Sequence, residues 1–154
     1  MGHFIKGLVA ATDVLVSFAS DHGLQAPIPL EQGFALLPLL DDDLDAMIPA
    51  PQTGHVDGFV HLSVEFAALL RRASAAGSLI YLETDYFGGV GTQAAVAYRH
   101  GDVLVAPRAS EAIGPINGAL RAVGVRVVHP AIDEFDSVGL QHHRQFDGGD
   151  ELRE

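Results

Sequence analysis

Short runs of β-branched and aromatic residues alternate with segments of helical spacing along most of the chain. Strands are predicted at 4–11, 34–37, 79–84, the run that ends at Tyr98, 103–106 and 125–128. Residues 26–30 contain two prolines, which predicts an extended connection or an edge strand. The short apolar pattern at 59–62 predicts either a brief strand or a segment that leads into a helix.

The clearest helical pattern begins after Ser63, where apolar residues recur every three or four positions. Ser63 is a favourable N-cap, and Gly77 is a typical C-terminal stop. Shorter helices are predicted after Asp13, with Asp41 as N-cap, after the Gly114-Pro115 pair, and over 133–138.

Helical and extended segments alternate in the first half of the chain, and an antiparallel meander follows in the second half. This pattern predicts an α+β fold with a mostly antiparallel sheet and helices packed mainly on one face. We expect one globular domain over 1–146 and an acidic tail over 147–154. In the central strand, Ile80 and Leu82 are expected to face the core, with Tyr81, Glu83 and Asp85 on the opposite side.

The centre of the pattern is a hairpin whose loop contains three glycines, Gly88, Gly89 and Gly91. Glycine adopts positive φ at little cost, so these residues are expected to shape the loop. The segment also fits the loose dinucleotide pattern G-x-G-x-x-A, but that pattern requires a substantial helix next. Too few residues precede the His100-Gly101 turn for such a helix, and a hairpin is therefore favoured.

Charge narrows the range of partners. The 154 residues carry a net charge of −11, and residues 1–70 contain nine acids and Lys6 as their one base. A phosphate backbone or an anionic membrane would be repelled by this half of the chain, whereas a basic protein would be attracted. With no cysteine and no apolar run near the ~20 residues of a membrane span, we expect a soluble, cytoplasmic protein.

Two polar segments supply the candidate site. Acids beside aromatic rings and glycines are typical of a patch that docks a protein partner, although solvated strand-end carboxylates and a C-terminal lid are the structural alternatives. The predicted partner-binding residues are Glu83, Asp85, Tyr86, Phe87, Gln93, Asp133, Glu134 and Asp136.

A small metal-dependent enzyme or metal-binding domain is the alternative hypothesis. Its ligands would be Glu83 and Asp85 with His142 and His143. H-E-x-x-H, the EF-hand pattern, G-x-S-x-G and the phosphate-binding G-K-[ST] are all absent. These absences weaken the case for an enzyme, and no cofactor is expected.

Three strings resemble a group of small uncharacterised bacterial proteins. They are Y-x-E-T-D-Y-F-G-G-x-G-x-Q at 81–93, I-N-x-A-L-R at 116–121 and D-E-F-D-x-x-G-L-x-x-H-R at 133–144. The resemblance covers the second half of the chain and implies no activity. In its small, acidic form the chain is similar to immunity proteins. The leading hypothesis is therefore a non-enzymatic, immunity-type inhibitor of a more basic partner, with self-association as a further possibility.

Overall fold

The computed structural model describes residues 2–48, 51–87 and 90–143. The strands are β1 (Gly2–Ala11), β2 (Ile28–Pro29), β3 (Phe34–Pro38), β4 (Leu79–Phe87), β5 (Val90–Arg99) and β6 (Asp102–Ser110). The helices are α1 (Thr12–His22), α2 (Asp41–Met47), α3 (Val64–Ala73), α4 (Pro115–Ala122) and α5 (Glu134–Val138), with 3₁₀ turns η1 (Ser74–Ala76) and η2 (Leu140–His142). Within these ranges, every helix is too short or too polar to cross a lipid bilayer.

The strands form one antiparallel sheet in the order β2-β3-β1-β4-β5-β6. The last three strands are consecutive neighbours, so the predicted meander and the α+β class are confirmed. β1 and β4 lie at the centre, and β4 pairs along its length with β1 on one side and β5 on the other. The predicted 26–30 edge segment contributes the two-residue edge strand β2.

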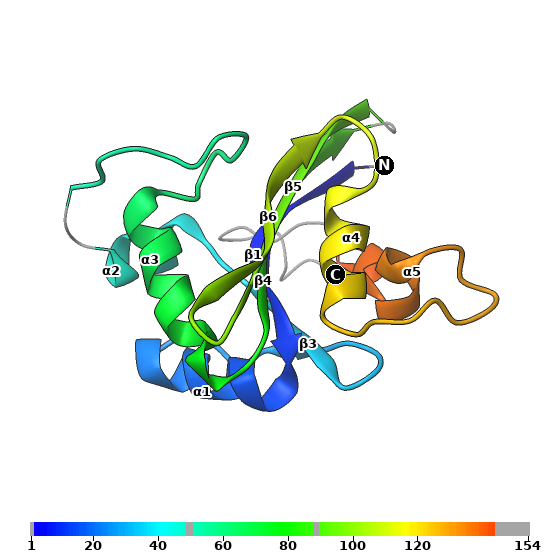
Figure 1. Ribbon diagram of the computed structural model, residues 1–154, viewed down its shortest axis with the longest axis horizontal. Coiled ribbons are helices and arrows are strands. Elements are labelled where there is room, and N and C mark those ends of the chain that lie inside the picture. Colours follow the sequence, from blue (N-terminus) through cyan, green and yellow to red (C-terminus); the bar gives the residue numbers. More distant parts are fainter. Residues whose placement is uncertain (1, 49–50, 88–89, 144–154) are drawn as a thin grey trace.

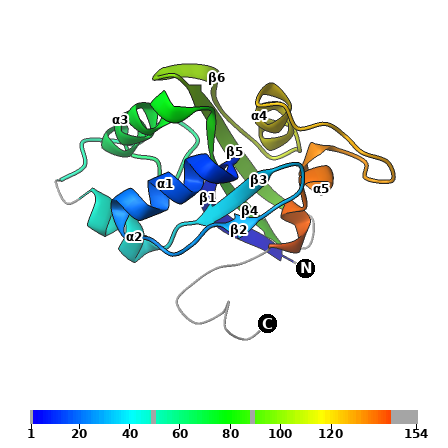
Figure 2. The same ribbon diagram turned by 90° about the horizontal axis from the view of Figure 1, so that it is seen from below.

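Both faces of the sheet are covered. α1, α2 and α3 pack on one face, and α4, α5 and η2 pack on the other (Figures 1 and 2). Three of the five described helices thus share one side, and the remaining two close the other. We call these sides the α3 side and the α4 side. Side chains alternate as predicted, with Tyr81 on the α3 side and Ile80 and Leu82 on the α4 side. The prediction that Tyr81 faces away from the core is wrong, because helices cover both faces and Tyr81 is buried in the core of the α3 side.

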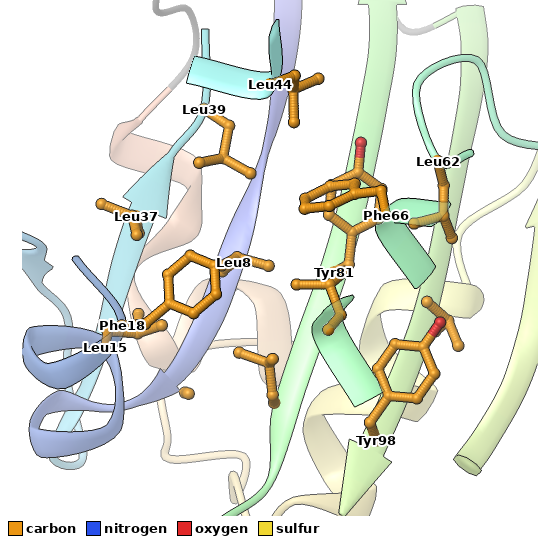
Figure 3. Close-up of a cluster of buried hydrophobic side chains, with 14 of the residues drawn as sticks. Leu8, Leu15, Phe18, Leu37, Leu39, Leu44, Leu62, Phe66, Tyr81 and Tyr98 are labelled. Atoms are coloured by element: carbon orange, nitrogen blue, oxygen red, sulfur yellow. The ribbon is translucent and has the colours of Figure 1, made fainter. Parts of the chain in front are cut away.

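The core on the α3 side is built around Tyr81, which is fully buried (Figure 3). Phe66 of α3 packs edge-on against the Tyr81 ring, with their ring centroids 5.4 Å apart. Ser63 accepts a hydrogen bond from the Phe66 amide and so begins α3 where its sequence predicts. The predicted cap therefore also fixes the position of the largest aromatic contact in this core.

The prediction of a strand at 125–128 is wrong, because this segment is irregular and does not pair with the sheet. Val125 is buried, but Val127 and Val128 remain about half exposed. The backbone of Arg126 is bound instead by the side chain of Gln32, whose amide donates to the Arg126 carbonyl and accepts from its N–H. The Gln32 side-chain amide thus makes the backbone hydrogen bonds that a neighbouring strand would otherwise make.

Candidate functional site

The candidate residues lie where β1, β4 and β5 come together near the central hairpin. On the α3 side, Phe4, Asp85 and Thr92 form one cross-strand row, because Phe4 pairs with Asp85 and Asp85 pairs with Thr92. On the α4 side, the adjacent positions His3 and Tyr86 form another pair. Strand alternation thus divides the predicted partner-binding residues of this hairpin between two faces of the sheet, with Asp85 on one and Tyr86 on the other.

Glu83 lies beneath the surface, so its predicted role as an exposed partner-binding residue is wrong. It is 8% exposed, and its carboxylate accepts hydrogen bonds from the backbone N–H groups of Val60 and His61 and from the Tyr81 hydroxyl, each at 2.8 Å. Burial raises the pKa of Tyr81, and the nearby Glu83 charge raises it further. Glu83 thus attaches the 58–61 loop to the sheet. Because its carboxylate binds the N–H groups of Val60 and His61, residues 59–62 need no pairing with a neighbouring strand.

Beside this loop, the α3 side has a pocket of about 230 Å³. We call it the α3-side pocket. Phe4 and Val60 line it and are 55% and 71% exposed, and the exposed Asp85 lies between β1 and β5 in the same lining. Lys6 also lines the pocket, but its ammonium group pairs at 2.8 Å with Asp41, and this hydrogen bond lowers the pKa of Asp41. An apolar rim and an acid therefore occupy one accessible site.

The α4 side has a second pocket, of about 330 Å³, which we call the α4-side pocket. It brings Tyr86, Gln93 and Asp133 together, three of the predicted partner-binding residues, although Gln93 is only 5% exposed. The remaining lining residues are His3, Thr84, Ile113, Ile116, Asn117, Phe135 and Gln141. Sequence reasoning did not select these residues for the site, because they come from five separate segments that only the fold brings together.

Hydrogen bonds hold the sheet wall of the α4-side pocket rigid. His3 lies 2.8 Å from the Thr84 hydroxyl through Nδ1 and 3.1 Å from the Leu140 carbonyl through Nε2. The Ile5 amide donates to Thr84 Oγ1 at 3.0 Å. Since a carbonyl can only accept, Nε2 of His3 carries a proton.

Amide side chains join this wall to the helices. Gln93 accepts from the Ile116 N–H at 2.8 Å, near the start of α4, and donates to the Tyr86 hydroxyl at 3.2 Å. Asn117 accepts from the Phe135 N–H and donates to Asp133. Asp133 is the N-cap of α5 and accepts from the Asp136 N–H at 2.9 Å. Gln93 and Asn117 therefore position both helix starts around the cavity.

The acids of the 133–136 segment have different surroundings. Glu134 is 6% exposed and pairs with Arg121 at 2.9 Å, so its predicted accessibility is wrong. Burial raises the pKa of Glu134, but the hydrogen bond from Arg121, a backbone hydrogen bond and the Arg121 charge outweigh this and hold the pKa below its ordinary value. Burial raises the pKa of Asp136, and the Asp133 charge adds to that rise. Asp133 and Asp136 thus form a concentration of negative charge beside the pocket.

The metal ligands of the alternative hypothesis are not brought together. Glu83 and Asp85 point to the α3 side, whereas η2, which contains His142, packs on the α4 side. Burial lowers the pKa of His143, and His142 contributes to that shift. Across the described ranges, no three His, Cys, Asp or Glu side chains form a group that could hold a metal ion.

Some predictions concern parts of the chain outside the described residues. These parts are Gly88, Gly89 and the Phe87 side chain at the hairpin, and the tail over 147–154. Gly91 is described, and its φ is 156°. Gly91 belongs to β5, where it pairs with Tyr86, and not to the loop itself. A Cβ placed there would overlap the carbonyl oxygen of Asp85 and approach Tyr86 Cα to 2.7 Å, so the close approach of β4 and β5 at this point requires glycine.

Comparison with protein-family models, with curated proteins and with solved structures finds no significant match. Function must therefore be argued from the two pockets.

Proposed function

We propose that this chain is a non-enzymatic protein-binding module, an inhibitor of the immunity type that binds a more basic partner at the α3-side pocket. The observation that carries the proposal is the row of Phe4, Asp85 and Thr92, which the helices of this side leave uncovered at the end of the sheet. Elsewhere on the same face, sheet residues such as Leu8 and Tyr81 are fully buried. The uncovered row is thus where the sheet itself can meet another molecule.

The pocket has the composition of an interface anchor. Phe4 and Val60 both expose large apolar side chains in the lining, and Asp85 adds a carboxylate to it. Apolar residues that gather around a pocket mark interaction sites more often than isolated ones do. The pocket's volume of about 230 Å³ fits a side chain or a short segment of a partner better than a large cofactor.

Charge supports a basic partner. Asp41, Asp42, Asp45 and Asp57 are exposed on α2 and on the loop that precedes α3, and the base Lys6 is already paired with Asp41. The acids would attract a cationic surface over a distance of about 10 Å at ordinary salt, which accelerates encounter. The apolar rim would then supply the short-range contacts that hold the complex.

The test uses single substitutions on the rim. Wild-type protein and the Phe4→Ser and Val60→Ser variants would be immobilised to capture partners, and the captured protein would be purified and titrated by calorimetry. Loss of a central apolar anchor is expected to weaken binding about 30-fold or more. Val16→Ser is the matched control, because Val16 is 51% exposed on α1 and lies outside the pocket.

The proposal fails if both rim variants bind the purified partner as tightly as Val16→Ser does, or if the captured partner is acidic. Circular dichroism and urea unfolding of each variant would show that the fold is intact. Because Phe4 and Val60 are already exposed, we expect little change in stability from either substitution.

A further inference from the structure

The α4-side pocket combines apolar walls with polar atoms that point to one kind of ligand. Ile113, Ile116 and Phe135 supply apolar surface, while Tyr86, Asp133 and Gln141 supply polar groups. Concave sites of about this volume with a few convergent polar groups are typical of ligand binding. The nature of the ligand follows from which of those groups already have partners.

Most polar groups of the lining are satisfied within the chain. His3, Thr84 and Asn117 each make two or more hydrogen bonds, and the Gln93 carbonyl oxygen accepts from α4. Gln141 is different, because its Oε1 is buried and has no hydrogen-bond partner within the described residues. A buried acceptor without a donor costs about 1–3 kcal/mol, so a ligand that donates to Gln141 would remove a penalty already present.

The remaining free capacity is also on acceptors. Each carboxylate oxygen of Asp133 accepts one described hydrogen bond, from Asn117 or from Asp136, and a carboxylate offers about four acceptor sites in all. Tyr86 lines the same pocket, but its hydroxyl oxygen already accepts a hydrogen bond from Gln93. Asp133 and Gln141 therefore offer oxygen atoms to a ligand that is rich in N–H groups.

Charge selects a cation. Among the described residues, neither lysine nor arginine lines this pocket. Asp133 contributes a negative charge to the lining, and Asp136 follows three residues later with a pKa that the Asp133 charge raises. Arg121 does not compensate for these acids, because it pairs with Glu134, and His142 lowers the pKa of Asp136 by less than burial and Asp133 raise it. An anion would be repelled, whereas a cation would relieve the repulsion between Asp133 and Asp136.

We propose that the α4-side pocket binds a compact cationic group, a guanidinium or a primary ammonium, on an apolar stem. The cation hydrogen-bonds to Asp133 and Gln141, and the stem lies against Ile113 and Phe135. The group belongs either to a free small molecule or to an arginine or lysine side chain of a bound protein. This site lies on the opposite side of the sheet from Asp85, so it stands independently of the proposed interface at the α3-side pocket.

The experiment titrates ¹⁵N-labelled full-length protein with N-butylguanidinium and with n-butylammonium and follows the amide resonances by NMR. N-butylurea is the neutral control, because it keeps the stem and the N–H donors but carries no charge. We expect saturable shifts at Tyr86, Asp133 and Gln141 with a cationic probe, and at least about tenfold weaker binding of N-butylurea.

Three variants locate the binding. Gln141→Leu removes the buried acceptor, and Asp133→Asn removes the charge while retaining a good N-cap for α5. Each is expected to weaken binding of the cationic probe about tenfold. Asp102→Asn is the matched control, because it removes the same charge from an exposed position in β6 that lies outside both pockets, and it should leave binding unchanged.

A further arm separates the two sources of the cation. Acetyl-arginine amide carries the same head group between two peptide bonds. Binding as tight as that of N-butylguanidinium indicates a partner's side chain, whereas clearly weaker binding indicates a free small molecule.

The proposal is overturned if neither cationic probe gives saturable shifts, if N-butylurea binds equally well, or if Asp102→Asn weakens binding as much as Gln141→Leu does. Each of these results would leave partner capture through Phe4 and Val60 unaffected. Conversely, loss of the proposed interface would not change the probe titration, and the two failures are distinguishable.

Discussion

Glu83 shows how neighbouring groups determine the role of a single carboxylate. Two backbone N–H groups of the 58–61 loop and the Tyr81 hydroxyl surround it, so its charge is solvated by the protein instead of by water. Asp85, two residues further along the same strand and on the same side, remains exposed. The 58–61 loop covers Glu83, which therefore has a structural role, but it leaves Asp85 exposed to solvent. The spacing of the two acids in the sequence does not determine this difference.

Replacing Glu83 with glutamine should destabilise the protein. The glutamine side chain keeps one acceptor oxygen but presents an amide that cannot accept from the second backbone N–H. Leaving that buried donor unsatisfied is expected to cost about 1–3 kcal/mol in the free energy of unfolding. Urea unfolding at pH 7, followed by circular dichroism, would measure it.

Tyr81→Phe is the comparison for this substitution, because it removes only one of the three donors and retains the ring that packs on Phe66. We expect Tyr81→Phe to cost clearly less than Glu83→Gln. An equal or larger loss in Tyr81→Phe would mean that the hydroxyl, and not the loop attachment, is the dominant contact of Glu83.

Among the elements, α5 is held in place by side chains of α4. Arg121 of α4 pairs with the buried carboxylate of Glu134 at the start of α5. Asn117 of the same helix accepts from the Phe135 N–H. A five-residue helix is too short to be stable alone, so these contacts from α4 hold α5 in place.

The Arg121–Glu134 pair should make stability depend on pH. Arg121 helps to hold the folded-state pKa of Glu134 below its ordinary value. The pair therefore stabilises the protein above the ordinary, unfolded-state pKa, and this contribution is lost as the pH falls through the lowered folded-state pKa. Arg121→Met is expected to lower the melting temperature at pH 7, and its difference from wild type should shrink at acidic pH as Glu134 becomes protonated. Differential scanning fluorimetry from pH 3 to 8 would measure this.

Arg126→Met is the matched control, because Arg126 is exposed and its described contacts with Gln32 involve only its backbone. At pH 7 its effect should be several times smaller than that of Arg121→Met. A pH-independent difference between Arg121→Met and wild type would show that the arginine stem, and not its charge, stabilises α5.

The elements follow from the sequence where local signals and burial agree. Three local signals predict their elements correctly, because each acts directly on the conformation of the backbone. They are the Ser63 cap of α3, the prolines near β2 and the glycine turn before β6. The segments at 59–62 and 125–128 were harder to predict because their backbone groups are bound by Glu83 and Gln32, which are distant in the chain. The same reason hides the α4-side pocket, since His3, Asn117 and Gln141 meet only after the sheet has formed.

At the scale of the whole molecule, the charges are distributed unevenly. The exposed acids of α2 and of the loop before α3 face little compensating charge, while Arg71 and Arg72 lie at the end of α3, where Arg71 reaches the Gly101 turn. Net charge far from zero destabilises a compact chain through self-repulsion. Its net charge of −11 therefore gives this protein an internal repulsion that salt can screen.

Stability at pH 7 should consequently rise as sodium chloride is added from near zero to about 0.15 M, over which the Debye length falls to about 8 Å. We expect an increase of about 2–4 °C in the melting temperature for each kcal/mol of repulsion removed. The Asp45→Asn/Asp57→Asn double variant should melt higher than wild type at low salt and gain less on salt addition, because both acids are exposed and neither has a described ion pair. If salt instead lowers the melting temperature of both proteins, attractive pairs such as Lys6–Asp41 outweigh the repulsion, and the acidic surface would not have the unbalanced charge on which recognition of a basic partner depends.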